Sequence, residues 1–207
     1  MEKALILLAG LPGTGKTFLG NLLREKFGAF EWVSQDVLKE ELFDLRGYSD
    51  LDGKTAIERE AWKLYGERME LAMAAGGGIL SDYPFSAKQK PLLQQLASRY
   101  GYDVLTIRLT GDPDVLFERQ RRRDLDPARH LSHLVSSYKK GQTMEDRSRA
   151  ELLLTREQFI ERCTTRGYDT FELGTLIELD VTDYAGVDYE ALMEQIARWN
   201  ANRSGRR

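Results

Sequence analysis

Short apolar runs alternate along this chain with longer stretches in which apolar residues recur every three or four positions. Residues 4–9 are apolar throughout and are followed by Gly10, which is typical of a strand buried on both faces of a parallel sheet. Apolar side chains then recur at helical spacing from Phe18 to Phe27, and Gly28 ends the predicted helix. Further strands are expected at residues 30–34, 78–82, 103–109 and 175–180. Further helices are expected at residues 37–45, 55–75, 86–100, from 113 onward, and at 188–200.

The alternation of strands and helices predicts an α/β fold in which helices cover both faces of a parallel sheet. Residues from about 124 to 170 break that alternation, because they are polar and charged and contain no clear strand. We expect them to form a mobile helical lid within a single domain of residues 1–207. The polar tail, residues 202–207, is expected to be frayed.

A length of 207 residues suits one domain whose core needs no disulfide or metal. The 30 basic and 33 acidic side chains give a net charge of −3, which excludes an overall cationic field, so nucleic acid is not the expected partner. The single cysteine, Cys163, indicates a reducing compartment, and the two histidines, His130 and His133, are expected to be exposed helix residues rather than metal ligands. No apolar stretch approaches the roughly 18 residues that a membrane-spanning helix needs, so we expect a cytoplasmic protein without a membrane contact.

Residues 10–17, GLPGTGKT, match the pattern G-x-x-x-x-G-K-[ST] in full. Glycines let backbone N–H groups converge on phosphate oxygens, and the following helix directs its positive end toward them. A glycine-rich turn without a ligand is the alternative, but the preceding strand and the following helix favour a phosphate loop. Lys16 is therefore the candidate for contact with the β- and γ-phosphates, and Thr17 is the candidate ligand of Mg²⁺. The nucleotide-binding candidates are Gly10, Gly13, Thr14, Gly15, Lys16 and Thr17.

Four segments of the chain carry a resemblance to one group of kinases. They are residues 5–17 around the phosphate loop, residues 33–39 (VSQDVLK), residues 79–85 (ILSDYPF) and the arginine-rich residues 117–123 (FERQRRR). Together they resemble the P-loop kinase group that includes polynucleotide 5′-hydroxyl kinases, zeta toxins, chloramphenicol phosphotransferase and gluconate kinases. The resemblance implies a five-stranded parallel sheet in the order 2-3-1-4-5, a helical lid, and ATP with Mg²⁺ as the phosphoryl donor.

Asp36 is the candidate for a catalytic carboxylate. It follows the second predicted strand, at the sheet edge where ligands bind in open parallel sheets, and a carboxylate there can orient an acceptor hydroxyl and take its proton. The resemblance also implies an acceptor-activating aspartate at this position. The alternative role is the N-cap of the helix from Val37. Lys39 lies one turn further on the same helix face and is a second acceptor-binding candidate, at a position where the family often has arginine.

Asp82 and a group of arginines complete the candidate site. Asp82 ends the third predicted strand, where it would bind Mg²⁺ or the acceptor, or serve only as a turn residue before Pro84. Arginines can meet the charge of a transferring phosphoryl group bidentately, and the resemblance implies that lid arginines close over ATP. Arg119 and Arg123 are the catalytic candidates, and Arg122 is a nucleotide-binding candidate. A solvated helix surface and a nucleic-acid patch are the alternatives, and the lack of interleaved aromatic residues disfavours the second.

These residues predict an ATP-dependent phosphotransferase that acts on a hydroxyl of a small molecule or nucleotide. The alternative is a nucleotide-hydrolysing switch or ATPase that acts on a protein partner. That class needs a glutamate after the third strand, which residues 81–83 (SDY) do not supply. Weaker candidates line the expected acceptor pocket under the lid or the adenine position: Arg129, Tyr138, Lys139 and Arg147 for the former, Thr182 and Asp183 for the latter.

Overall fold

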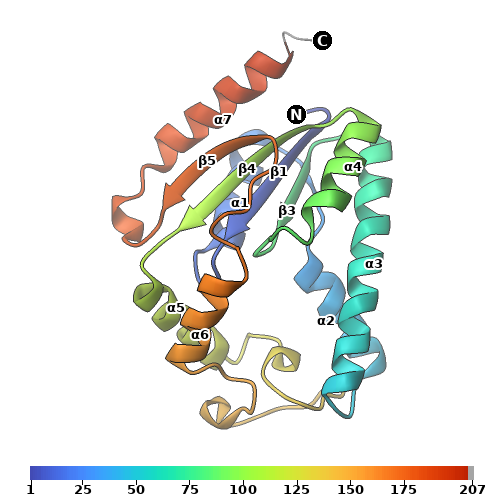
Figure 1. The fold of residues 1–207 in the computed structure, drawn as a ribbon, viewed down its shortest axis with the longest axis vertical. Helices are drawn as coiled ribbons and strands as arrows, with labels where there is room; N and C mark the ends of the chain where they lie inside the picture. Colours follow the sequence, from blue (N-terminus) through green and yellow to red (C-terminus); the bar gives the residue numbers. More distant parts are fainter. Residues whose placement is uncertain (205–207) are drawn as a thin grey trace.

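Five parallel strands form the centre of the molecule in the order β2-β3-β1-β4-β5 (Figure 1). This computed structural model describes residues 1–204, so the last three residues of the predicted domain and tail lie outside the described residues. The predicted sheet and its order are confirmed. The strands are β1 (Ala4–Gly10), β2 (Glu31–Trp32), β3 (Ile79–Asp82), β4 (Asp103–Thr110) and β5 (Thr175–Asp180). The second strand has two residues rather than the five expected over 30–34.

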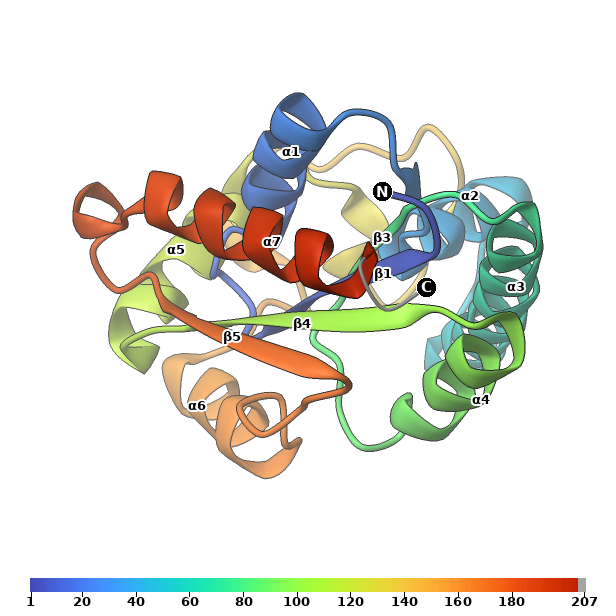
Figure 2. The same cartoon turned by 90° about the horizontal axis from the view of Figure 1, so that it is seen from above.

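Helices cover both faces of the sheet, as Figure 2 shows. The helices are α1 (Lys16–Phe27), α2 (Gln35–Arg46), α3 (Leu51–Ala75), α4 (Lys90–Tyr100), α5 (Pro113–Leu125), α6 (Arg156–Thr165) and α7 (Tyr189–Ser204). Every residue of β1 is buried, because alternate side chains enter two different cores. Leu5 and Leu7 pack with α3 and α4, whereas Ile6 and Leu8 pack with α1 and α7. No helix within residues 1–204 is long and apolar enough to cross a membrane.

The bounds of several helices differ from those predicted. Helix α4 begins at Lys90 instead of residue 86, because Ser86 and Gln89 close a separate turn in which the Gln89 side chain accepts from the Ser86 N–H at 2.9 Å. Helix α3 begins earlier than expected, since Asp50 caps it by accepting from the Gly53 N–H at 2.7 Å. Helix α7 continues through Ser204, so residues 202–204 are helical rather than frayed.

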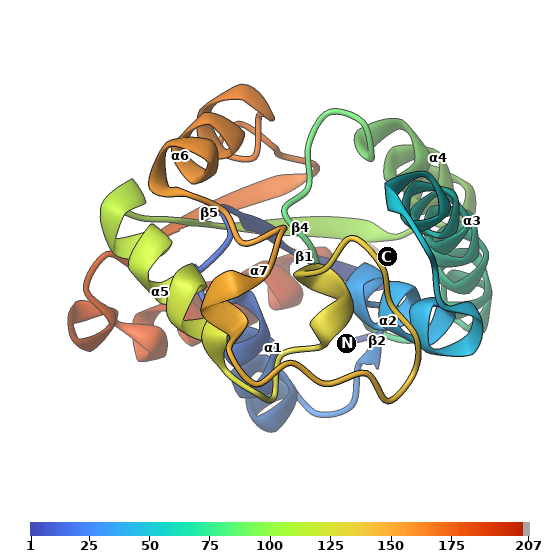
Figure 3. The ribbon, with the colours of Figure 1, turned by 90° about the horizontal axis from the view of Figure 1, so that it is seen from below.

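Residues 124–170 differ most from the prediction. Apart from the end of α5, two short 3-10 turns and helix α6, this segment is irregular, so the expectation of a helical lid is wrong over most of its length. Figure 3 shows the chain leaving α5, passing beside α2, and returning to α6. The segment therefore crosses the carboxyl edge of the sheet, where the phosphate loop also lies.

Two separate apolar clusters anchor this crossing segment. One joins Leu131, Leu134 and Val135 to α2 and α3, and a backbone bridge pairs Tyr48 with Tyr138. The other joins α6 to α5 and to the phosphate loop; its buried members are Leu11, Leu116, Phe117, Phe159, Cys163 and Tyr168. The segment thus connects α2 and α3 to α5 and the phosphate loop.

Candidate active site

The phosphate loop connects β1 to α1 in the way its sequence predicts. Gly13 and Gly15 adopt φ values of +80° and +79°, in the left-handed region that favours glycine. A Cβ at Gly13 would lie 2.6 Å from the Leu116 carbonyl oxygen, and one at Gly15 would lie 2.9 Å from the Tyr184 hydroxyl. Side chains at these positions would therefore collide with α5 and with Tyr184, so the loop requires glycine there. The loop leads into the N-terminus of α1, where free backbone N–H groups favour phosphate binding.

Lys16 folds back over this loop. Its Nζ donates to the carbonyl oxygens of Gly10 at 3.1 Å and Leu11 at 2.7 Å. The pKa of Lys16 is lowered to about 8, chiefly by burial and in part by the charge of Arg123, while the charges of Asp82 and Asp36 oppose the shift. The ammonium group thus has neutral backbone oxygens as acceptors at the loop, and the oxygens of a bound phosphate can take their place.

Thr17 and Asp82 meet at the carboxyl end of β3. The Thr17 hydroxyl donates to Asp82 Oδ2 at 3.3 Å, and the Trp32 indole N–H donates to Oδ1 at 2.8 Å. Trp32 thus fixes the orientation of the carboxylate beside the first turn of α1. A threonine hydroxyl and a carboxylate are oxygen donors of the kind that Mg²⁺ prefers, so this pair fits the ion expected with a nucleotide.

Asp36 lies in the first turn of α2 but does not cap it. Ser34 is the N-cap residue, and the Asp36 carboxylate instead accepts from Lys39 Nζ at 2.7 Å. The N-cap alternative is therefore wrong. Burial opposes ionisation of Asp36, but Lys39, His133 and Arg129 together hold its pKa well below the usual value. Asp36 is thus ionised at neutral pH and faces Lys16 closely enough to influence its pKa.

Residues of the crossing segment reach α2 beside Asp36. His133 Nε2 lies 2.5 Å from Glu40 Oε1, and Arg129 lies 3.4 Å from the same oxygen. Burial lowers the pKa of His133 to about 4, although its hydrogen bond to Glu40 opposes the shift. His133 is mostly buried and neutral at pH 7, so the expectation of an exposed helix histidine is wrong. The His130 ring also has a hydrogen-bond partner on α2, because its Nε2 lies 3.1 Å from Asp44 Oδ1.

The arginines of α5 occupy different parts of the site. Arg119 lies over the Tyr184 ring, with its guanidinium 3.7 Å from the ring centroid, and donates to the carbonyl oxygens of Val181 and Thr182. Arg123 lines the cleft, and its charge is one of the causes that lower the pKa values of Lys16 and Arg129. Arg122 lines the same cleft. The structure therefore separates Arg119, next to the loop after β5, from Arg123.

One cleft of about 1680 Å³ brings these residues together. This volume exceeds the roughly 300–1,000 Å³ of a typical single-ligand pocket, so there is room for a nucleotide and a second substrate. The sequence-predicted residues that line it are Gly13, Gly15, Lys16, Thr17, Asp36, Lys39, Asp82, Arg119, Arg122, Arg123 and Arg129. Gly10 and Thr14 support the loop from within, and the buried Thr14 hydroxyl donates to the Leu11 carbonyl at 2.8 Å.

Some candidates lie elsewhere, and other cleft residues were missed by sequence reasoning. Tyr138 donates to Asp44, and Arg147 donates to backbone carbonyls of the crossing segment, so these two residues brace it. Thr182 accepts from the Asp112 N–H beside the stacked Arg119. Among the missed lining residues are several on α3, at α6 and after β5: Lys54, Glu58, Trp62, Gln158, Arg162, Arg166 and Tyr184. The three on α3 and the three at α6 are each spaced four residues apart, which marks one face of each helix and can be read from the sequence.

Residues 5–141 match the protein family described as an AAA domain, which covers more than half of the chain. The chain belongs to this AAA-domain family. The matched region contains the phosphate loop, Asp36, Asp82 and the arginines of α5. Comparison with curated protein sequences gives no significant match.

Solved structures similar to this AAA domain share its whole architecture. A provisionally named kinase from Chloroflexus aurantiacus J-10-fl is 25% identical, with a TM-score of 0.74, over 96% of this chain and 98% of that one. A gluconokinase from Sinorhizobium meliloti 1021 is 18% identical, with a TM-score of 0.52, over 99% of this chain and 97% of that one. The tunicamycin resistance protein of Deinococcus radiodurans is 19% identical, with a TM-score of 0.52, over 95% of each chain. These likenesses identify a P-loop fold of the kinase type.

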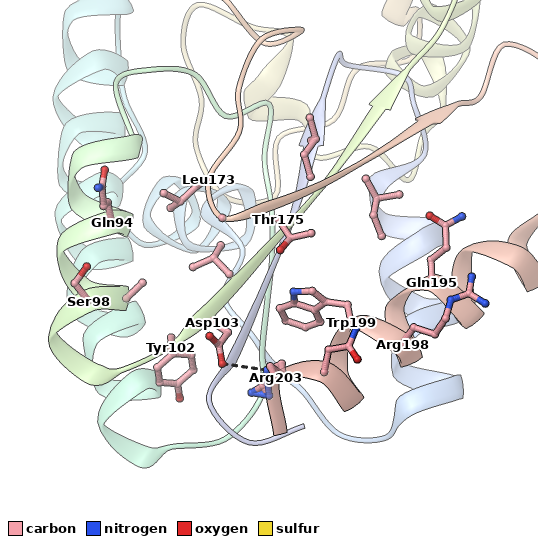
Figure 4. Close-up of a pocket in the computed structure, with 16 residues that line it drawn as sticks. Gln94, Ser98, Tyr102, Asp103, Leu173, Thr175, Gln195, Arg198, Trp199 and Arg203 are labelled. Atoms are coloured by element: carbon pink, nitrogen blue, oxygen red, sulfur yellow. Dashed lines mark ion pairs between the residues drawn. The ribbon is translucent and has the colours of Figure 1, made fainter. Parts of the chain in front are cut away.

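The AAA domain has a second groove, at the opposite end of the sheet (Figure 4). It lies among α4, the first residues of β4 and β5, and the end of α7. Asp103 and Arg203 form an ion pair there, at 3.4 Å between Oδ2 and Nε. Because the phosphate loop follows the carboxyl end of β1, this groove is not part of the nucleotide cleft.

Proposed function

We propose that the protein transfers the γ-phosphoryl group of ATP to a hydroxyl of a small molecule or nucleotide. The observation that carries this proposal is the placement of Asp36 and Lys16 in one cleft, close enough for the carboxylate to influence the lysine pKa. A phosphate-binding lysine with an ionised carboxylate across from it is the arrangement that phosphoryl transfer to a hydroxyl needs. Within the AAA-domain family, the group with polynucleotide kinases, zeta toxins and chloramphenicol phosphotransferase remains our proposed subgroup.

The nucleotide side of the cleft would be formed by the phosphate loop and α5. ATP with Mg²⁺, when bound, supplies the phosphoryl group and a divalent charge that neutralises the phosphate oxygens. Backbone N–H groups from Gly13 to Thr17 would bind phosphates, and Thr17 and Asp82 would hold Mg²⁺. Lys16, Arg123 and Arg122 would stabilise the charge of the phosphates.

Arg119 takes a different part in this proposal. Its stacking on Tyr184 and its two carbonyl acceptors hold the guanidinium at the loop after β5. We therefore propose that Arg119 and Tyr184 flank the nucleotide base, next to Thr182 and Asp183. A role of Arg119 at the transferring phosphoryl would require it to leave these partners.

The acceptor side would be organised by α2. Asp36 would accept a hydrogen bond from the acceptor hydroxyl and take its proton late in the transfer, when the oxygen has become acidic. A strongly depressed pKa suits this role, because the carboxylate must be ionised to orient the hydroxyl. Lys39 fixes the Asp36 side chain and is also available to contact the acceptor.

Lys16→Ala tests the nucleotide part of the proposal. We expect ATP affinity or turnover to fall at least tenfold, which corresponds to about 1.4 kcal/mol, with the protein still folded. Calorimetric titration with ATP–Mg²⁺ measures the affinity, and thermal unfolding measures the stability. Lys26→Ala, an exposed lysine at the end of the same helix, is the matched control. Equal ATP binding and turnover by wild type and Lys16→Ala would overturn the assignment.

A panel of hydroxyl-bearing acceptors tests the transferase part. We expect ADP release above the background without acceptor, with one phosphorylated acceptor formed for each ADP. Release of ADP and inorganic phosphate at the same rate with and without every acceptor would instead indicate a nucleotide-hydrolysing switch or ATPase.

A further inference from the structure

Two helix faces oppose each other across the part of the cleft that lies beyond Asp36. Lys54, Glu58 and Trp62 follow at four-residue spacing on α3, so they share one face of that helix. Arg162 on α6 and Arg166, the C-cap residue, share a face in the same way. All five line the cleft, and the nucleotide side described above uses none of them.

Lys54 is a buried lysine in this part of the cleft. Its side chain is only 9% exposed, and its Nζ donates to the Ser132 carbonyl oxygen at 2.8 Å. Within residues 1–204 no carboxylate lies within ion-pair distance of this ammonium group. Burial lowers the pKa of Lys54 to about 8; Glu58 opposes the shift, and Lys39 and Arg162 add to it. A buried ammonium without a carboxylate partner is costly unless another anion neutralises it.

Arg162 and Arg166 add two further cations from the opposite face of the cleft. Neither has an acidic partner in the part of the chain that the structure describes, whereas Lys39 pairs with Asp36, and Arg129 pairs with Glu40 and Asp124. Arg166 has a hydrogen bond to the Tyr168 hydroxyl, at 3.4 Å. Arg162 and Arg166 are therefore unpaired cations of the cleft at α6, in addition to the α5 arginines that we assign to the nucleotide side.

The same chamber contains aromatic and acidic groups next to Asp36. The rings of Trp62 and Tyr83 are packed edge to face with centroids 4.8 Å apart. Burial raises the pKa of Tyr83; Asp36 and Glu58 raise it further, and Arg166 opposes them. Tyr83 thus lies within electrostatic reach of both the carboxylate that would orient the hydroxyl and the arginine that carries unpaired charge.

We infer that the acceptor is a hydroxyl-bearing small molecule with an oxyanion group, a carboxylate or a phosphate, which Arg162, Arg166 and Lys54 bind while its hydroxyl lies at Asp36. This inference rests on the proposed kinase function and specifies its substrate class. Arginine pairs bind both oxyanions bidentately, so carboxylate and phosphate share this recognition. Trp62 and Tyr83 would cover the apolar surface of the same molecule, and Glu58 would accept from additional hydroxyls.

Anion binding can be measured without knowing the acceptor. The wild-type protein is first saturated with a nonhydrolysable ATP analogue and Mg²⁺, so that the phosphate loop is occupied. Inorganic phosphate and acetate are then titrated in separate experiments while tryptophan fluorescence is followed, with Trp62→Phe used to assign the signal. We expect saturable binding of at least one of the two anions, and the stronger one identifies the oxyanion class.

Arg162→Gln and Arg166→Gln are the test variants, and Arg59→Gln, on an exposed position of α3 outside the cleft, is the matched control. We expect anion affinity to fall about tenfold or more in each test variant and to stay unchanged in the control. In the acceptor screen, anionic acceptors should exceed their neutral counterparts by at least tenfold in kcat/KM, and the double variant should lose that preference through KM. Thermal melts confirm that the variants are folded.

Three results would overturn the inference: no saturable anion binding to the analogue-bound protein, equal anion binding by wild type and the double variant, or a preference for neutral acceptors. Weaker binding of the ATP analogue to the arginine variants, with anion binding unchanged, would assign these arginines to the nucleotide. Failure of the wild-type protein to bind the analogue counts against the proposed function, and the anion titration then still reports on the three cations.

Discussion

Asp36→Asn separates the chemical role of this carboxylate from its structural role. In the folded protein Asp36 accepts from Lys39 Nζ at 2.7 Å, with 36% of the aspartate side chain and 11% of the lysine side chain exposed. An exposed ion pair contributes about 0–1 kcal/mol and a buried one several times more, so this half-exposed pair lies between these limits. The amide oxygen of asparagine still accepts from Lys39. We therefore expect a loss of about 1 kcal/mol, or roughly 2–4 °C in melting temperature for a chain of this size.

The expected effect on the reaction is larger. Asparagine cannot accept a proton from the acceptor hydroxyl, and removal of a general base lowers rates by roughly 10²–10⁴-fold. That range corresponds to about 3–5 kcal/mol in the activation barrier, well above the expected change in stability. Binding of ATP–Mg²⁺ should change little, because the phosphate loop is intact. The assay is phosphorylated acceptor per unit time at saturating substrates, with calorimetric ATP titration and thermal melts of both proteins.

Lys39→Met provides the matched control. It breaks the same ion pair but retains the carboxylate, so it should destabilise the protein similarly while lowering kcat less than tenfold. An equal loss of kcat in Lys39→Met and Asp36→Asn would mean that the ion pair matters and that Asp36 is not the base. If Asp36→Asn keeps more than about a third of wild-type turnover, the base assignment is wrong and Asp82 becomes the candidate.

Two further predictions concern the metal and the crossing segment. Asp82→Asn should raise the Mg²⁺ concentration for half-maximal activity several-fold, because Thr17 and Asp82 are the oxygen pair at the loop; an unchanged Mg²⁺ requirement would exclude Asp82 as a ligand. In the absence of ligands, residues 124–170 should exchange amide hydrogens faster than the sheet does, and they should become protected when an ATP analogue and acceptor bind. Tyr138→Phe removes the 2.5 Å hydrogen bond to Asp44 and should accelerate exchange in this segment. Uniform protection of the segment in both states would argue against a mobile lid.

The sheet could be predicted because its signal is local. Each buried strand is a short apolar run, and the phosphate loop fixes where β1 ends and α1 begins. Asp36 and Asp82 could be placed at one edge because the carboxyl ends of parallel strands meet there. What the sequence did not show is that Trp32 orients Asp82, since that contact joins residues 50 positions apart.

The acceptor side of the cleft could not be predicted in the same way. The four-residue spacing of Lys54, Glu58 and Trp62 defines a helix face, but periodicity does not say which other helix that face opposes. Arg162 and Arg166 come about 100 residues later, and their position depends on how α6 packs against α5 and the phosphate loop. The irregular chain before α6 carries no periodic signal, which is also why a helical lid was wrongly expected.

Helix α2 connects the chemistry to the crossing segment. Asp36, Glu40 and Asp44 follow at four-residue spacing, so they form one acidic face. Glu40 contacts His133 and Arg129, and Asp44 contacts His130 and Tyr138, so these two acids anchor the segment. Arg129, which is charged at pH 7, is also among the groups that lower the pKa of Asp36. Any movement of the segment away from α2 would therefore remove positive charge from beside the proposed base. The carboxylate would therefore have its lowest pKa only when the segment lies over the cleft, where the segment would also exclude the water that competes with an acceptor hydroxyl.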